Sequence, residues 1–167
     1  MSEETPLHCL VEIPKGSRNK YEWDEELQAI RFDRFLFSSV VYPLDYGMIP
    51  ETLAEDGDPL DAMVCVSEPT FPGCVVEARP VARLGLRDQA GEDAKILVVP
   101  ADDPRFTAVR DLKSVPPHTL REIEEFFKTY SVLEGKRKIL KGWSGREAAL
   151  REIRKAADRH ARESSPS

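Results

Sequence analysis

The feature that most constrains the fold is a series of short strand-like segments with no helix-like segment between them. In the first of them, Leu10 and Glu12 alternate with Val11 and Ile13, which is typical of a strand with two different faces. The strand-like segments are residues 7–13, 20–23, 29–32, 40–46, 62–66, 74–84 and 94–99; the second and third look like a hairpin, and Gly and Pro separate the later ones. Pro43 interrupts one of them, which we expect to be an irregular or edge strand. Because parallel strands need helical crossovers, the pattern favours a small barrel.

Helix-like periodicity is confined to the later part of the chain. Thr119 with Glu122, and Ser144 with Glu147, both have the spacing of a capping box. Apolar residues follow each pair at helical spacing, so we expect two main helices. A chain of 167 residues can bury a sizeable core in one unit, and we expect a single domain over residues 1–167 with a flexible tail at about 162–167.

Composition excludes several classes of protein. The formal net charge of −6 argues against a general nucleic-acid binder, which normally has a basic face. Cys9, Cys65 and Cys74 lack the paired spacing of a zinc site, so we expect buried free thiols. No apolar run approaches the roughly 20 residues that span a bilayer. Residues 1–6 are acidic and lack the apolar centre of a signal peptide, so we expect a cytoplasmic protein with no membrane partner.

The most informative motif for function is the segment 56–61, which holds Asp56, Asp58 and Asp61 beside a turn at Gly57 and Pro59. Two unit charges about 4 Å apart repel by roughly 4 kcal/mol at an effective dielectric constant of about 20. A positive group must therefore lie between these acids, and hard divalent cations prefer oxygen ligands. The segment predicts a metal site.

The sequence disfavours an EF-hand at this predicted metal site. The sixth residue of a loop beginning at Asp56 is Asp61 where that motif needs glycine, and the twelfth is Ser67 where it needs glutamate.

Other charged residues also lie near the ends of predicted strands. Lys20 and Glu22 are two residues apart, as are Asp93 and Lys95, so each pair shares one face of a strand. Asp88 precedes Asp93 across a glycine, and a hairpin would bring both acids to one end of the barrel. Taken one pair at a time, a solvated charged face is the alternative, because most charged residues are exposed.

Several motifs occur together and in order: VEIPKGSRNKYE at 11–22, DRF at 33–35, YPLDYG at 42–47, DGDPLDA at 56–62, DQAGEDAK at 88–95, FFKTY at 126–130 and LEGK at 133–136. With these motifs the chain resembles the soluble family I inorganic pyrophosphatases of bacterial type, over roughly residues 8–160. The resemblance implies a mainly β fold of the α+β class, a five-stranded OB-like closed barrel flanked by two helices. It also implies hydrolysis of pyrophosphate to two orthophosphates with several Mg²⁺ ions, for which Mn²⁺ or Zn²⁺ can substitute.

The resemblance also implies roles for individual residues. The carboxylates that match metal-binding positions are Asp56, Asp61, Asp88, Asp93, Glu22 and Glu12. The side chains that match phosphate contacts are Lys20, Arg34, Lys95, Tyr46 and Tyr130. Asp58 matches the residue that orients and deprotonates the attacking water, and Tyr42 matches a supporting residue. Relatives of this type are homohexamers, which we expect here as well.

The chain departs from the family pattern at two positions. Ser131 follows Tyr130 where family members usually carry a phosphate-binding lysine, and Gln89 stands where many have glutamate. Lys128, Lys136 and Arg137 are the nearby cations that could reach the site instead.

Three other functions stay open at this point. The chain could be a weakly active relative, because a phosphate-binding cation is missing at position 131. An OB-like barrel can also serve as a nucleic-acid-binding module. Hydrolysis of another phosphoanhydride is the third alternative, although no Walker motif is present.

Overall fold

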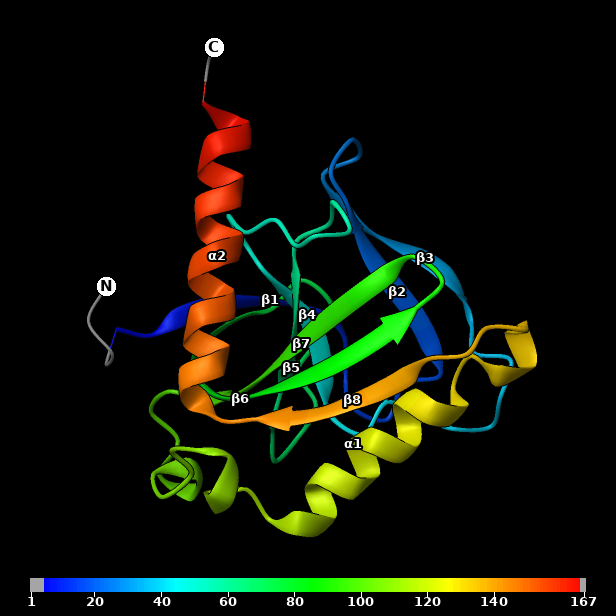
Figure 1. Ribbon diagram of the computed structural model, residues 1–167. Coiled ribbons are helices and arrows are strands. Elements are labelled where there is room, and N and C mark those ends of the chain that lie inside the picture. The colour runs from blue at the N-terminus through cyan, green and yellow to red at the C-terminus, as the bar shows by residue number, and fades with distance from the viewer. Residues whose placement is uncertain (1–4, 166–167) are drawn as a thin grey trace.

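The computed structural model of the chain describes residues 5–165. Five strands form a closed ring: β1 (Leu7–Ile13), β4 (Asp45–Ile49), β5 (Leu60–Val64), β7 (Gly91–Pro100) and β6 (Val75–Asp88), which pairs back with β1 (Figure 1). The strands β5 and β7 run parallel, and the other pairs in the ring are antiparallel. The predicted mainly β fold with a five-stranded, OB-like closed barrel is confirmed.

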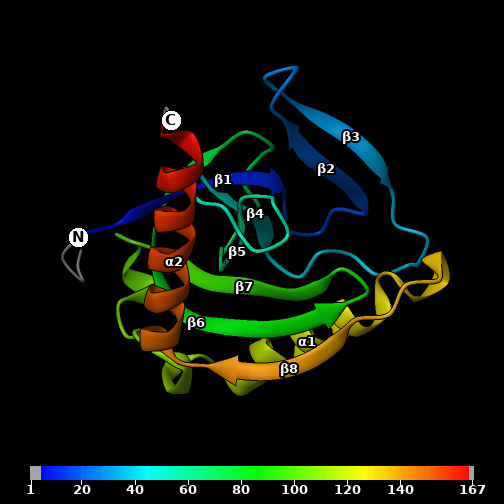
Figure 2. The same ribbon diagram turned by 45° about the horizontal axis from the view of Figure 1, so that its top comes forward.

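Three further strands extend this barrel. β2 (Asn19–Asp24) and β3 (Ala29–Phe35) form a separate antiparallel hairpin beside it, and β8 (Ile139–Ser144) pairs with the outer edge of β6 (Figure 2). The strand β8 was not expected from the sequence.

The two expected helices are present as α1 (Pro117–Thr129) and α2 (Arg146–Ser164). Short 3-10 helices occupy Pro104–Phe106, Leu112–Ser114 and Val132–Glu134. None of the helices within residues 5–165 combines the length and apolar character that crossing a bilayer requires. Within the tail expected at 162–167, residues 162–164 belong to α2, and residues 166–167 lie outside the described part of the chain, as do residues 1–4 at the other end.

Both predicted capping boxes are wrong. Helix α1 begins after Pro116, with a proline in its first turn and no side-chain cap, so Thr119 lies already inside the helix. Helix α2 begins after Gly145, and its Arg146 N–H donates to Asp111 Oδ1 at 2.9 Å. The cap of α2 is therefore supplied by a residue distant in sequence, which local spacing does not reveal.

The strand predicted at 40–46 is also misplaced, because β4 begins only at Asp45. The Asp45 carboxylate is fully buried and accepts hydrogen bonds from the backbone N–H of Lys15 at 2.8 Å and of Thr70 at 3.1 Å. These bonds join two loops to the first residue of β4. The residues before Asp45 form an irregular connection that contains Pro43.

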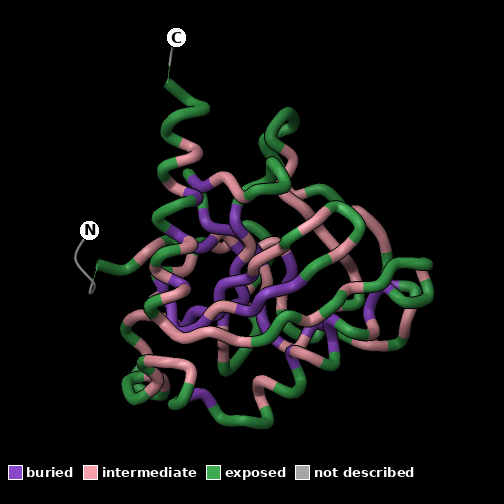
Figure 3. Tube along the Cα trace, in the orientation of Figure 1, coloured by how far each residue is buried: buried purple, intermediate pink, exposed green. Residues whose placement is uncertain are grey.

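The barrel strands are buried on both faces, as the purple segments at the centre of Figure 3 show. On β7, Leu97 and Val99 belong to a cluster with Phe126 and Phe127 of α1. The alternate residues of β7 pack in a second cluster with the apolar stripe of α2, namely Ala149, Ile153 and Ala156. The helices thus fix the barrel from two sides, and α1 brings its aromatic residues to one end of the barrel.

Candidate active site

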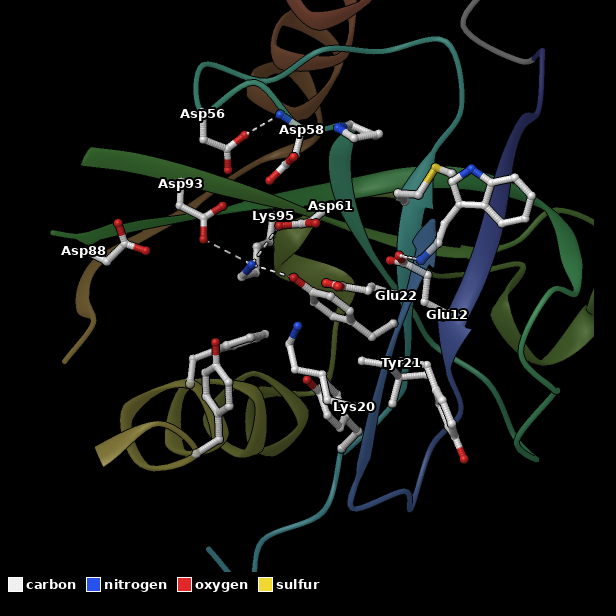
Figure 4. A pocket seen from close by; sticks show the side chains of 18 of the residues that line it. Glu12, Lys20, Tyr21, Glu22, Asp56, Asp58, Asp61, Asp88, Asp93 and Lys95 are labelled. Atoms are coloured by element: carbon white, nitrogen blue, oxygen red, sulfur yellow. Dashed lines mark hydrogen bonds and ion pairs between the residues drawn. The ribbon is translucent and has the colours of Figure 1, made fainter. Parts of the chain in front are cut away.

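All the predicted site residues except Arg34 gather around one cavity of about 510 Å³ at the end of the barrel beside the β2–β3 hairpin (Figure 4). Acidic side chains line it from several directions: the loop between β4 and β5, the β6–β7 hairpin, and the strands β1, β2 and β5. The lining carboxylates are Glu12, Glu22, Glu25, Asp56, Asp58, Asp61, Asp88 and Asp93. The lining ammonium groups are Lys20, Lys95 and Lys138.

The loop that carries Asp56 and Asp58 is held by its own hydrogen bonds. Asp56 Oδ1 accepts from the Asp58 N–H at 2.9 Å, and Gly57 between them has a φ of +91°, which favours glycine. Thr52 is buried; its Oγ1 donates to the Ile49 carbonyl at 2.5 Å and accepts from the N–H at the start of β5 at 2.9 Å. The loop therefore presents its two acids in a defined position above the cavity.

At the centre of the site, Lys95 lies between two acids. Its Nζ is 2.9 Å from Asp61 Oδ2 and 3.2 Å from Asp93 Oδ2, and it donates to the Tyr46 hydroxyl at 2.6 Å. Parallel pairing of β5 with β7 places Asp61 opposite Lys95, which explains how residues from two strands meet. Burial alone would lower the pKa of the Lys95 ammonium, but the two carboxylates raise it above its ordinary value, so this group stays charged.

The positive group between these acids is thus an ammonium in this structure. Among residues 5–165, no three acidic, His or Cys side chains are close enough to hold one metal ion by themselves. Mg²⁺ usually keeps several waters and binds through one or two carboxylates together with substrate phosphates. A set of separated aspartates around a cavity is the kind of oxygen donor set that suits such an ion.

Two of the acids have unusual proton affinities. Burial, reinforced by the carboxylates of Asp56 and Asp61, raises the pKa of Asp58 above its ordinary value. Glu12 lies on β1 and accepts from the Trp23 N–H at 2.7 Å. Burial raises the pKa of Glu12 to about 7, although the Trp23 hydrogen bond opposes this shift. Perturbed carboxyl groups of this kind are frequent at functional sites.

The charged side chains that the β2–β3 hairpin contributes differ in whether they line the cavity and in which residues they pair with. Lys20 lines the cavity, with its Nζ 3.2 Å from Asp33 Oδ2. Arg34 is not among the lining residues, because its guanidinium pairs with Asp33 and lies 2.6 Å from Glu134 Oε1. Glu22 lines the cavity and also pairs with Arg31 at 2.6 Å.

The three tyrosines predicted for the site all line the cavity, and the aromatic residues of α1 support them. The Tyr130 ring stacks on Phe126 with centroids 5.0 Å apart, and the Tyr42 ring contacts Phe126 at 4.5 Å. Burial raises the pKa of Tyr42 and of Tyr46 above their ordinary values, so both hydroxyls stay protonated. Protonated hydroxyls can donate hydrogen bonds to an anion.

Sequence reasoning missed Lys138, which precedes β8 and lines the cavity. Its Nζ is 3.3 Å from Asp88 Oδ2 and 3.8 Å from Asp93 Oδ2. Among the described residues, none of the three cations considered as replacements, at positions 128, 136 and 137, lines this cavity. The only available signal was a basic run after Tyr130, and choosing among its members required the position of β8. Gln89 lies exposed at the β6–β7 turn, outside the lining set.

Comparison with known proteins gives a consistent result. Residues 9–161 match the family model described as inorganic pyrophosphatase. The inorganic pyrophosphatase of Methanosarcina acetivorans is 56% identical over 160 residues, which are 96% of this chain and 95% of that protein. The crystal structure of the Thermus thermophilus inorganic pyrophosphatase has a TM-score of 0.91 and 46% identity, covering 94% of this chain and 92% of the other. The Helicobacter pylori enzyme has a TM-score of 0.92 and 38% identity, covering 95% of each chain.

Proposed function

Because the chain belongs to the inorganic pyrophosphatase family, we propose that its acidic cavity binds Mg²⁺ and pyrophosphate and that Asp58 deprotonates the attacking water. Hydrolysis of pyrophosphate to two orthophosphates is the activity of this family, and membership implies dependence on a divalent metal ion. One observation supports this assignment of the site most strongly: Lys95 forms ion pairs with both Asp61 and Asp93, below the loop that holds Asp58.

The metal ligands in this proposal are carboxylates only. Asp56, Asp61 and Asp93 would hold the activating ions, and the additional ligands would be Asp88, Glu22 and, through water, Glu12. Dications bound there lower the pKa of a water molecule and neutralise phosphate oxygens. Mg²⁺ is favoured over softer metals because the lining set offers oxygen donors without cysteine or histidine. Activity measured in a series of Mg²⁺, Mn²⁺ and Zn²⁺ would rank these ions.

Asp58 is suited to the role of base because its carboxylate lies in the loop above the cavity and has a raised pKa. In the proposed step the water oxygen forms a bond to one phosphorus atom, Asp58 takes a proton, and the bridging P–O bond breaks to release the second orthophosphate. A general base typically contributes about 10²–10⁴ in rate. Uncatalysed phosphate hydrolysis is far slower than this factor can overcome, so most of the acceleration must come from charge neutralisation and alignment.

The phosphate contacts in this proposal are the side chains Lys20, Lys95, Tyr46, Tyr130 and Arg34, with Tyr42 as support. Lys20 and Lys95 offer ammonium groups, and Tyr46 and Tyr130 offer hydroxyl donors. Arg34 must exchange its ion pair with Glu134 for phosphate before it can take part, and its two parallel N–H groups would then suit two phosphate oxygens.

Orthophosphate release from pyrophosphate, measured with and without Mg²⁺, tests the proposal directly. Release that requires the metal is the expected result, and release at the same rate in a chelator would contradict it. The nucleic-acid-binding alternative is not favoured, because the family match covers nearly the whole chain and carboxylates dominate the lining of the cavity.

For its assembly and location, we infer a homohexamer in the cytoplasm. The hexamer rests on the likeness to bacterial relatives, and sedimentation equilibrium would test it. On α2, the apolar residue Ile153 is buried in the core of the chain. The cytoplasmic location is supported by Cys9, Cys65 and Cys74, which are all unpaired; burial was expected of all three, but only Cys9 is buried and the other two are partly exposed.

A further inference from the structure

Lys138 provides a positive charge that no sequence motif assigned to the site. Its side chain is 13% exposed, and its Nζ lies 3.3 Å from Asp88 Oδ2 and 5.8 Å from the centre of the Tyr130 ring. It therefore faces the cavity from the side of β8, beside the tyrosine whose next residue is Ser131.

Ser131 cannot supply a charge to the cavity. The residue is 2% exposed, and its hydroxyl donates to the Lys136 carbonyl at 3.3 Å, so it serves the turn that follows α1. This leaves three ammonium groups, Lys20, Lys95 and Lys138, among the lining residues. Each of them can attract a polyanionic substrate into a cavity that is lined by eight carboxylates.

The surrounding side chains hold the ammonium group of Lys95 more firmly than that of Lys138. Lys95 is 3% exposed and lies between two carboxylates and a tyrosine, so it has little freedom to move. Lys138 is 13% exposed, and its contacts are longer: 3.3 Å to Asp88, 3.8 Å to Asp93 and 5.8 Å to the centre of the Tyr130 ring, at the end of a long flexible side chain. These two acids are also among the proposed metal ligands. An ammonium and a dication compete for the same carboxylate oxygens, because like unit charges about 4 Å apart repel by roughly 4 kcal/mol at an effective dielectric constant of about 20.

We propose that Lys138 is a substrate-binding residue whose ion pairs with Asp88 and Asp93 are exchanged for a phosphate oxygen of pyrophosphate when divalent cations bind to these two carboxylates. This inference rests on the proposed function. It places in the cavity, from the residue directly before β8, the cation that is absent at Ser131. The same ammonium thus opposes metal binding before substrate arrives and favours substrate binding afterwards.

The proposal gives Lys138→Met two effects of opposite sign. Without substrate, Mg²⁺ measured by isothermal titration calorimetry should bind about fivefold more tightly, because the competing ammonium is gone and one such ion pair is worth about 1 kcal/mol. At saturating Mg²⁺, the non-hydrolysable analogue imidodiphosphate should bind about 10- to 100-fold more weakly, because a hydrogen bond to a charged group is lost. Lys138→Arg should restore analogue binding and return Mg²⁺ affinity toward that of the wild type.

Lys141→Met is the matched control. Lys141 lies on β8, three residues after Lys138, its side chain is 44% exposed, and its ion pair with Glu92 is 4.0 Å long and outside the cavity. The Lys141→Met substitution should leave the affinities for Mg²⁺ and for imidodiphosphate unchanged. A thermal melt of each variant checks that the fold persists.

Other outcomes overturn the proposal in distinguishable ways. If Lys138→Met tightens Mg²⁺ but leaves imidodiphosphate binding unchanged, Lys138 is only an ion-pair partner of the acids. If it weakens Mg²⁺ binding, the competition is absent. If the wild-type protein binds imidodiphosphate but ignores Mg²⁺, or releases no orthophosphate from pyrophosphate, the proposed function itself fails and the inference falls with it.

Discussion

The Lys95 ammonium lies 2.9 Å from Asp61 Oδ2 and 3.2 Å from Asp93 Oδ2, and so links strand β5 to strand β7 at the floor of the cavity. It neutralises acids that would otherwise repel each other, and it is placed where a phosphate could also be bound. We therefore expect that removal of the Lys95 charge lowers both the stability of the fold and the binding of phosphate.

Lys95→Met should lower the free energy of unfolding in metal-free buffer by about 3 kcal/mol, the low end of the range for breaking a buried ion pair, because Asp61 and Asp93 keep some exposure to water. Urea denaturation measures this change. Added Mg²⁺ should recover part of the loss, since a cation again lies near the two carboxylates. Lys141→Met, at an exposed position, serves as the control, and its free energy of unfolding should lie within about 0.5 kcal/mol of that of the wild type.

Asp58→Asn should reduce turnover by about 10²- to 10⁴-fold, the usual contribution of a general base, while the thermal midpoint stays close to that of the wild type. Asn has the same shape but cannot take the proton. The Asp58 side chain accepts no hydrogen bond from another segment in the described structure, so little stability depends on it. Steady-state orthophosphate release measures the effect, and turnover equal to that of the wild type would remove Asp58 from the role of base.

Stability of the metal-free protein should depend on the ionisation of Glu12. Its folded-state pKa of about 7 lies above the ordinary value of 4.5, so the folded protein holds this proton more tightly than the unfolded chain. The contribution to stability is complete below about pH 4.5 and is lost as pH rises through about 7. For one group the slope is up to about 1.4 kcal/mol per pH unit.

Glu12→Gln cannot ionise, so its free energy of unfolding should fall less between pH 5 and pH 8 than that of the wild type. Urea denaturation at several pH values compares the two proteins. Parallel curves would mean that Glu12 titrates alike in the folded and unfolded chains.

Gly47→Ala should lower the free energy of unfolding by about 3 kcal/mol or more, which is at or above the upper end of the range usual for overpacking a core. A Cβ atom at position 47 would lie 1.9 Å from the Leu10 carbonyl oxygen, because β1 and β4 approach closely at this point. Both strands would have to move apart. A thermal melt measures the change, and an unaltered midpoint would show that β1 and β4 are separated more widely than this structure has them.

The parts of the fold that depend on local patterning could be predicted from the sequence. The strand expected at 7–13 is β1 with the same bounds, because its apolar and polar residues alternate and one face is buried. The acids of the β6–β7 hairpin were expected at one end of the barrel, and Asp88 and Asp93 do share Lys138 there. Two helices were expected and found, because their apolar residues keep helical spacing.

Features that depend on distant partners could not be predicted. The cap of α2 comes from Asp111, and the start of β4 is set by the two loops that Asp45 joins. Arg34 was expected at phosphate, yet Glu134, one hundred residues away, holds its guanidinium outside the cavity lining. Lys138 reaches the cavity because β8 pairs with β6, and β8 has no alternating pattern that would have revealed it.

The central claim is that carboxylates of this cavity hold the divalent ions on which hydrolysis depends. The most direct measurement is orthophosphate release as a function of Mg²⁺ concentration for the wild type, for Asp61→Asn, and for Asp158→Asn, whose side chain is exposed on α2. We predict no orthophosphate release without metal. Asp61→Asn should require at least tenfold more Mg²⁺, which corresponds roughly to the loss of one charged ligand contact. Asp158→Asn should leave the dependence on Mg²⁺ concentration unchanged. Coincident Mg²⁺ curves for Asp61→Asn and the wild type would contradict the account.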